Sequence, residues 1–251
     1  MKIAIVTGAS SGMGSEMVTQ LADRFAGIGE IWVIARRMDR LLAFEGTVPV
    51  RVRPFALDLA DPENLDVLRE TLNKENPNVK ILVNAAGYGK TGTAGSMDES
   101  QSLGMIRLND EALTAVTEMV LPYISENSRI IQFASAAAFL PQPGFAVYAA
   151  SKSYVLSYSR ALSAELRPKN IAVTAVCPGP VSTEFFDIAL EGKPLSFYKK
   201  LVMVKPDFVV RTAIRDSLMG KEISIAGPVM KLFFVLCRIL PHRLIMKFIT
   251  W

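Results

Sequence analysis

A glycine-rich loop between a strand and a helix, close to the start of the chain, constrains the fold more than any other feature. The short apolar run Ile3–Val6 leads into the loop Thr7–Gly14 (TGASSGMG), and a segment of helical character, 16–25, follows it. Glycines let a backbone approach a pyrophosphate closely, and the N–H groups at the start of a helix point toward the anion. This order predicts a dinucleotide-binding unit.

The alternation of strand and helix continues along the chain. The predicted strands are Ile3–Val6, Glu30–Ala35, Val50–Leu57, Val79–Val83, Arg129–Ala134, Asn170–Val176 and Glu222–Ala226. Helices are expected over 16–25, 62–74, 97–126, 148–166 and 207–219. A helix after each strand specifies a parallel sheet with right-handed crossovers. We therefore predict an α/β fold with a Rossmann-like, doubly wound, seven-stranded parallel sheet. It forms a single domain, 1–226, followed by a C-terminal helical extension, 227–251.

Composition and charge narrow the class of protein. Half of the 251 residues are hydrophobic, which is typical of a folded chain. The two cysteines form neither a disulfide framework nor a metal cluster, and the first apolar run is too short for a signal peptide. We therefore expect a cytoplasmic protein without a metal. The net charge of +4 comes from 225–251, which contains four bases and no acid, so we expect no nucleic-acid partner.

The second predicted strand ends at Arg36 and Arg37, where dinucleotide-binding units recognise the adenosine ribose. An acid there would accept from a free 2′-hydroxyl, whereas arginine suits a 2′-phosphate. The sequence therefore favours NADP(H) over NAD(H), although the two arginines could simply begin the next helix in solvent. Further cofactor contacts are expected after the third and fourth strands, at Asp58, Leu59, Asn84, Ala85 and Gly87.

Tyr148 and Lys152 lie four residues apart in a predicted helix, so their side chains share a face. A nearby cation favours the phenolate and lowers the pKa of a tyrosine, which suits it to general acid or base catalysis. Alone, the pair could be an accident on an exposed helix. The other candidate site residues, however, follow the ends of predicted strands, which meet at one edge of a parallel sheet. These residues are Gly8, Arg36, Asp58, Asn84, Ser135 and Pro178.

These motifs together resemble the short-chain dehydrogenase/reductase family over residues 2–226. The T-G-x-x-x-G-x-G loop is Thr7–Gly14, the N-A-A-G segment is Asn84–Gly87, and Met13 stands where isoleucine is common. The resemblance implies the catalytic residues Asn109, Ser135, Tyr148 and Lys152. It also implies cofactor contacts at Gly8, Ser10, Ser11, Gly12, Met13, Gly14, Tyr148, Lys152, Pro178, Gly179, Val181 and Thr183.

The resemblance implies a mechanism as well. NADPH would transfer hydride to a substrate carbonyl that Ser135 hydrogen-bonds, while Tyr148 supplies the proton. Lys152 would lower the pKa of Tyr148 and bind the nicotinamide ribose, and Asn109 would hold a water that leads to Lys152. Oxidation of an alcohol is the same path reversed. Members of such families are usually homo-oligomers, so we expect one here.

The expected lid, 184–205, and the extension concern the substrate. The lid is rich in apolar residues, including Leu195, Phe197 and Tyr198, which indicates either a hydrophobic substrate (a steroid, a bile-acid-like molecule or a lipid ketone) or simple packing onto the domain. The extension could contact a membrane peripherally through 228–250, or cover the cleft or a subunit interface, which we prefer. The predicted substrate contacts are Ser135, Tyr148, Tyr88, Phe145 and Phe185.

Two alternatives belong to other functional classes. A binding protein that senses NADP without catalysis would keep the fold. A serine hydrolase could use Ser10, because residues 8–12 also fit the G-x-S-x-G pattern and His242 could serve as its base. The hydrolase is disfavoured because only seven residues precede Gly8, too few for the upstream loop of an oxyanion hole.

Overall fold

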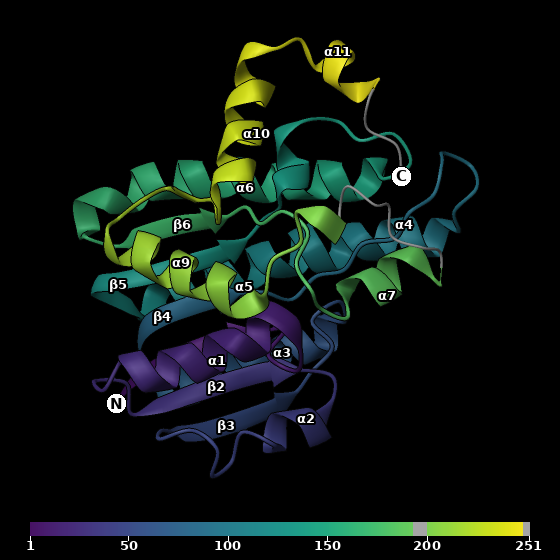
Figure 1. Cartoon of the computed structure of the whole chain (residues 1–251). Coiled ribbons are helices and arrows are strands. Elements are labelled where there is room, and N and C mark those ends of the chain that lie inside the picture. The colour runs from purple at the N-terminus through teal and green to yellow at the C-terminus, as the bar shows by residue number, and fades with distance from the viewer. Residues whose placement is uncertain (193–199, 248–251) are drawn as a thin grey trace.

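The computed structural model describes residues 1–192 and 200–247, and a central parallel sheet is its framework (Figure 1). Its seven strands lie in the order β3-β2-β1-β4-β5-β6-β7. Because the strand order reverses between β1 and β4, their carboxyl ends diverge there and leave space for a ligand. The strands are β1 (Lys2–Thr7), β2 (Glu30–Ala35), β3 (Arg51–Ala56), β4 (Asn78–Asn84), β5 (Ile124–Phe133), β6 (Ala172–Val176) and β7 (Ile223–Ser224).

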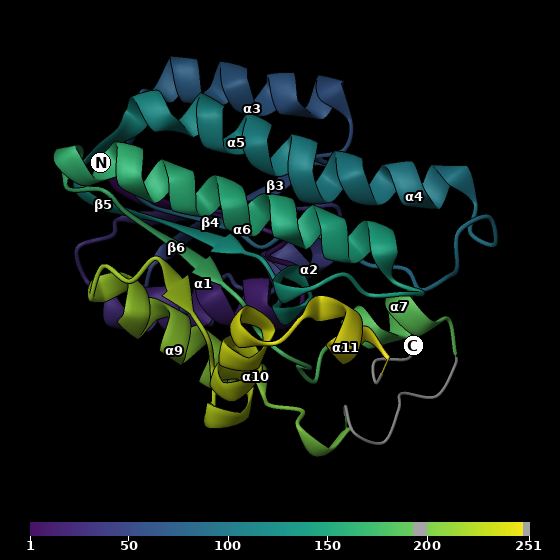
Figure 2. The ribbon, with the colours of Figure 1, turned by 90° about the horizontal axis from the view of Figure 1, so that it is seen from above.

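Helices cover both faces of the sheet (Figure 2). One face carries α1 (Gly12–Arg24) and α9 (Pro206–Leu218), and the other carries α3 (Pro62–Glu75), α4 (Glu99–Ile106), α5 (Leu113–Val120) and α6 (Ala146–Leu166). The short α2 (Met38–Leu42) follows β2. Around the carboxyl edge lie α7 (Phe185–Leu190), α10 (Pro228–Ile239) and α11 (His242–Met246). The predicted doubly wound fold is confirmed.

The alternation of side chains along β1 explains the two-sided core. Ala4 and Val6 pack with α1 and α9, whereas Ile3 and Ile5 pack with the helices of the opposite face. A parallel strand buried on both faces must be apolar at consecutive positions, as this one is.

The segment 97–126 differs from the single helix expected there. A π-helical turn, Arg107–Ala112, separates α4 from α5, and a 3₁₀ turn with Pro122 follows α5 before β5 begins at Ile124. Proline lacks an N–H group and cannot continue a helix, so the strand starts earlier than predicted. Single π-turns inside helices occur frequently at functional sites, and this one carries Asn109.

No helix in the described ranges is both long and apolar enough to cross a bilayer.

Gly14 offers a direct test of the loop packing. A Cβ added at Gly14 would overlap the carbonyl oxygen of Gly8 and lie 2.7 Å from its carbonyl carbon. Both atoms are backbone and cannot move aside cheaply, so we expect Gly14→Ala to lower the free energy of unfolding by about 2 kcal/mol in urea denaturation. Gly27→Ala is the control, because nothing lies within 4 Å of its added Cβ. Equal stability of the two variants would contradict this packing.

Candidate active site and dinucleotide cleft

Two adjoining cavities open at the carboxyl edge of the sheet. The first, which we call the loop cavity, has a volume of about 190 Å³ and lies against the glycine-rich loop. The second, the apolar cavity, has a volume of about 420 Å³ and lies against Ser135 and Tyr148. Met13, Thr183 and Phe185 line both, so a long ligand could extend from one cavity into the other.

Close backbone packing shapes the loop cavity. Gly8 adopts a positive φ of 67°, and a Cβ there would lie only 2.6 Å from the backbone nitrogen of Ala86. The hydroxyl oxygen of Thr7 accepts from the N–H groups of Ala85 and Ala86, each at 3.2 Å, and fastens the loop to the end of β4. The predicted cofactor residues that line this cavity are Gly8, Ser10, Ser11, Gly12, Met13, Gly14, Arg36, Arg37, Asp58, Leu59, Ala85, Gly87 and Thr183.

Two arginines line the loop cavity beyond the end of β2. Arg37 donates from Nε and Nη2 to the Ser10 hydroxyl at 3.3 and 3.1 Å, and it also pairs with Glu184 at 3.1 Å. Glu184 pairs with Arg40 as well, and hydrogen bonds from Arg40 and Arg37 hold the pKa of Glu184 below its usual range. Arg36 is exposed, 3.9 Å from Asp58. Sequence reasoning missed Glu184, which orients Arg37 although it stands far away in the chain.

Two predicted contacts lie elsewhere. The side chain of Asn84 is buried and donates to Thr117 and Gln132, each at 3.0 Å, so it faces α5 and β5 and does not line the cavity. Tyr88 was expected at the substrate but lines the loop cavity, because its hydroxyl donates to the Gln101 carbonyl at 3.2 Å. Pro178, Gly179 and Val181 line the apolar cavity, which adjoins the loop cavity, so they stay predicted cofactor contacts.

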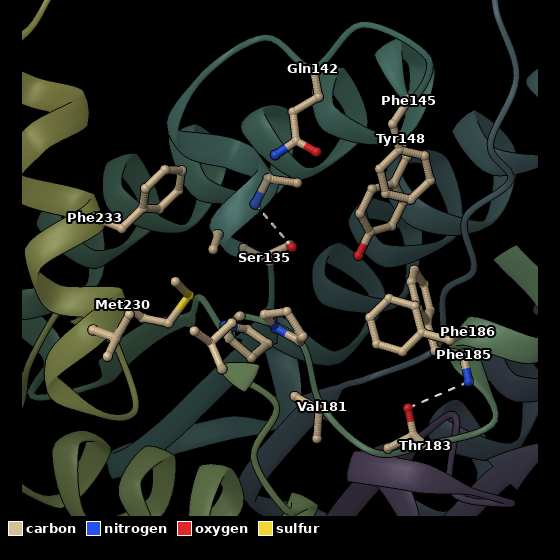
Figure 3. Close-up of a pocket in the computed structure, with 18 of the residues that line it drawn as sticks. Ser135, Gln142, Phe145, Tyr148, Val181, Thr183, Phe185, Phe186, Met230 and Phe233 are labelled. Carbon is tan, nitrogen blue, oxygen red and sulfur yellow. Dashed lines mark hydrogen bonds between the residues drawn. The ribbon is translucent and has the colours of Figure 1, made fainter. Parts of the chain in front are cut away.

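Tyr148 and Ser135 supply polar groups to the apolar cavity (Figure 3). The Tyr148 ring stacks on Phe145 with centroids 4.3 Å apart and lies 5.3 Å from the ring of Phe185. The Ser135 oxygen accepts from the Ala137 N–H at 3.1 Å, so the hydroxyl hydrogen can be directed to the Tyr148 oxygen or to a ligand. The Tyr148 hydroxyl points into the same space.

Burial sets the proton affinities of the tyrosine and lysine. It raises the pKa of Tyr148 to about 12, although a hydrogen bond with Ser135 opposes this rise. Lys152 donates from Nζ to the Phe133 carbonyl at 2.9 Å and lies 5.8 Å from the centre of the Tyr148 ring. Burial lowers the pKa of Lys152 to about 8. Desolvation of the buried phenol therefore decides the direction of the shift, and the pKa of Tyr148 is raised where we expected it to be lowered.

Asn109 joins the segment after β4 to α6. Its side-chain oxygen accepts from the Tyr88 N–H at 3.0 Å, and its nitrogen donates to the Tyr88 carbonyl and to Ser151 at 2.9 and 3.0 Å. Protein groups thus occupy both amide donors, and only the oxygen keeps a free lone pair. A Cβ at Gly87 would lie 2.8 Å from that oxygen and 3.3 Å from the Lys152 nitrogen, so glycine is needed where these two side chains approach.

Asp110 is a site residue that sequence reasoning missed. It follows Asn109 in the π-turn, and its Oδ1 atom is buried with no hydrogen-bond partner among the described residues. Burial raises the pKa of Asp110 to about 6, against the opposing charge of Lys152. Only its place beside Asn109 could have drawn attention to it in the sequence.

The C-terminal extension forms much of the apolar cavity wall. Met230 and Phe233 of α10 lie across the cavity from Phe185 and Phe186 (Figure 3). Val202 of the expected lid also lines the cavity, whereas Leu195, Phe197 and Tyr198 lie outside the described residues. The α10 residues in the wall are Val229, Met230, Leu232, Phe233 and Leu236.

The arrangement does not support a serine hydrolase. His242, the one histidine of the sequence, lies at the start of α11, and its Nε2 is 2.9 Å from the Cys237 carbonyl oxygen. His242 lines a separate cavity, while the Ser10 hydroxyl accepts from Arg37. A nucleophilic serine needs an adjacent base, and this histidine is not beside it.

Comparison with known proteins identifies relatives over most of the chain. The family model for short chain dehydrogenase matches residues 2–192. Sulfoacetaldehyde reductase 2 of Chromohalobacter salexigens is 35% identical over 189 residues, which cover 73% of this chain and 74% of the relative.

Two solved structures are similar across most of the chain. A short-chain dehydrogenase from Sphingobium yanoikuyae in complex with NADPH is 27% identical, with a TM-score of 0.78 and coverage of 90% of this chain and 87% of that one. The 3-ketoacyl-(acyl-carrier-protein) reductase of Brucella melitensis, complexed with NADH, is 25% identical, with a TM-score of 0.75 and coverage of 90% and 97%.

Asp110 makes the stability of the protein dependent on pH. Its raised pKa means that the folded state holds the proton more tightly than the unfolded chain, where the pKa is about 3.9. The cost of ionising Asp110 is therefore small in acid and grows as the pH rises through about 6. We expect Asp110→Asn to stabilise the protein by about 1 kcal/mol more at pH 8 than at pH 5 in urea denaturation, allowing for partial exposure.

The control for this variant is Glu111→Gln, which removes an exposed carboxylate from the same turn. A stabilisation by Asp110→Asn that does not change with pH would contradict the assignment.

Proposed function

This chain belongs to the short-chain dehydrogenase family of oxidoreductases, and from that membership we propose that it interconverts a hydrophobic ketone and its secondary alcohol with NADP(H). The observation that carries the proposal is the position of the Ser135 and Tyr148 hydroxyls in an apolar cavity that adjoins the glycine-rich loop.

The residues of the loop cavity would hold a nicotinamide dinucleotide, which would supply the hydride. Residues of this chain would bind the substrate oxygen and protonate it. Ser135, held by the Ala137 N–H, donates its hydrogen to the carbonyl. Tyr148, with its pKa near 12, keeps its proton at neutral pH and can donate it to the oxygen as negative charge develops there. Lys152 has a pKa of about 8, so it is mostly cationic at pH 7 and stabilises the resulting phenolate.

Arg36 and Arg37 support the preference for NADP(H). Both line the loop cavity beyond the end of β2, where the adenosine ribose binds in this fold. Glu184 and Ser10 already orient Arg37, so less side-chain entropy is lost when it meets a phosphate. Arg36 is exposed and available to the same anion.

The lining of the apolar cavity supports a hydrophobic substrate such as a steroid, a bile-acid-like molecule or a lipid ketone. Phe145, Phe185, Phe186 and Phe233 contribute aromatic surface, and the described lining residues include no charged side chain. A small anionic substrate would lack a cationic partner in such a cavity. The polar residues that line the apolar cavity are Ser135, Gln142, Tyr148 and Thr183.

Replacement of Tyr148 tests catalysis. We expect Tyr148→Phe to lower the turnover number for an apolar ketone by roughly 10²- to 10⁴-fold, because the proton donor is lost, with NADPH binding unchanged. Steady-state kinetics and fluorescence titration give the two quantities. The control is Tyr154→Phe, in the same helix, whose hydroxyl meets Thr114. Near-normal turnover of Tyr148→Phe would contradict the mechanism, and no turnover by the unaltered protein on a broad panel of carbonyls would favour a binding protein that senses NADP.

Replacement of the two arginines tests the cofactor. We expect Arg36→Gln with Arg37→Gln to raise the NADPH dissociation constant by about 10-fold or more, because charge-assisted hydrogen bonds to the 2′-phosphate are lost. NADH binding should change far less. Arg69→Gln with Lys74→Gln removes two charges from α3 as a control. Equal affinity of the unaltered protein for both cofactors would refute the arginine assignment.

A further inference from the structure

The helix α10 presents two different faces. Phe233, Phe234 and Cys237 pack inward against the 3₁₀ turn Ala136–Phe139, and the Phe139 ring lies 4.8 Å from that of Phe234. The helix stands off the edge of the molecule, with α11 beyond it (Figure 1). Its other side therefore has no covering element among the described residues.

The uncovered side of α10 is apolar. Val229, Leu232, Val235, Leu236 and Ile239 recur at helical spacing of three and four residues and form one stripe along it. Their exposed fractions run from 39% for Leu236 to 72% for Ile239. Leu240 and Leu244 extend the exposed apolar surface toward and into α11. We call this surface, from 229 to 244, the α10 face.

Positive charges border the α10 face. Lys231 and Arg238 lie seven residues apart on the flank of the stripe, and Arg243 and Lys247 follow in and after α11. All four are exposed, and none forms an ion pair within the described part of the chain. The sequence from 225 to 251 contains no acid. An apolar stripe with basic flanks is complementary to a surface that is apolar inside and anionic outside.

The α10 face is continuous with the apolar cavity. Val229, Leu232 and Leu236 belong to the exposed stripe and also line the cavity in which Ser135 and Tyr148 lie. The mouth of the cavity therefore opens beside the uncovered apolar surface. A molecule that left the surface could enter the cavity without crossing charged side chains of α10.

We propose that the α10 face docks on an anionic lipid bilayer, with its apolar stripe in the interface and its bases at the headgroups, so that a hydrophobic substrate passes from the bilayer into the apolar cavity. The docking itself stands on the exposed stripe, the flanking charges and the open mouth. The passage of substrate rests on the proposed function. A second copy of this chain is the competing occupant, but four unpaired cations on each copy would repel one another there.

Vesicle sedimentation tests the docking without any substrate. We expect the full chain to bind vesicles of phosphatidylcholine with phosphatidylserine more tightly than vesicles of phosphatidylcholine alone. Binding should weaken between about 0.1 M and about 1 M salt, as the screening length falls from about 10 Å to about 3 Å. Lys231→Gln, Arg243→Gln and Lys247→Gln together should lower the partition coefficient on the order of 100-fold. This variant keeps Arg238, which lies 4.5 Å over the Phe234 ring.

Matched variants separate the docking surface from general charge and hydrophobicity. Arg24→Gln, Lys74→Gln and Lys169→Gln remove three exposed bases elsewhere and should leave binding nearly unchanged. Val235→Gln with Ile239→Gln removes two exposed apolar side chains that do not line the cavity and should weaken binding about 10-fold or more. Leu218→Gln with Met219→Gln, exposed at the C-terminal end of α9, is their control.

Two results would overturn the proposal. One is equal binding by the α10-face and control variants. The other is a stable dimer in size-exclusion chromatography with light scattering that Val235→Gln with Ile239→Gln dissociates, with no vesicle binding by the unaltered chain. That result would assign the face to a second copy.

Kinetics test the passage of substrate separately. We expect Val235→Gln with Ile239→Gln to raise the apparent KM for a long-chain ketone carried in vesicles and to leave turnover of a short water-soluble ketone unchanged. An equal effect on both ketones would overturn the passage. Vesicle binding without turnover of any ketone would refute the proposed function alone, and turnover without vesicle binding would refute the docking alone.

Discussion

The fastening of the glycine-rich loop to the end of β4 is the interaction on which the loop cavity depends. The Thr7 hydroxyl oxygen accepts hydrogen bonds from the backbone N–H groups of Ala85 and Ala86. The loop and the end of β4 lie so close together that no side chain fits at Gly8. The strand order reverses at this point, so the loop forms one wall of an opening whose other wall is the segment after β4. Gly14 fixes the start of α1 against the same loop. The outline of the loop cavity follows from backbone packing and a single threonine hydroxyl.

Desolvation is the main cause of the shifted pKa values of Tyr148, Lys152 and Asp110. The same burial raises the pKa of Tyr148, lowers that of Lys152 and raises that of Asp110, since each group is least stable there in its charged form. The tyrosine is consequently a phenol poised to give a proton, and the lysine is a cation held by the Phe133 carbonyl. Asn109 hydrogen-bonds both to the segment after β4 and to α6, the helix that carries Lys152. It thereby fixes the position of that helix relative to the loop cavity.

The extension contributes one wall of the apolar cavity and one exposed surface, and these are two sides of the same helix. Phe233 and Phe234 hold α10 against the turn that begins after Ser135, while Val235 and Ile239 face outward. A shift in the position of α10 would therefore alter both the volume of the apolar cavity and the orientation of the basic side chains of this helix. The wall of the apolar cavity thus depends on a segment that lies outside the parallel sheet.

The sequence alone determined the sheet, the order of its elements and the residues that meet at its carboxyl edge, because apolar runs, glycine spacing and strand ends are local properties that parallel pairing brings together. It also predicted Ser135 and Tyr148 as neighbours. Only the tertiary structure decided which way Asn84 and Tyr88 point, that Glu184 orients Arg37, that one oxygen of Asp110 is buried and that α10 borders the apolar cavity. It also reversed the expected pKa of Tyr148. The physical reason is that partners distant in the chain, and the water they exclude, set the direction of a side chain and its proton affinity.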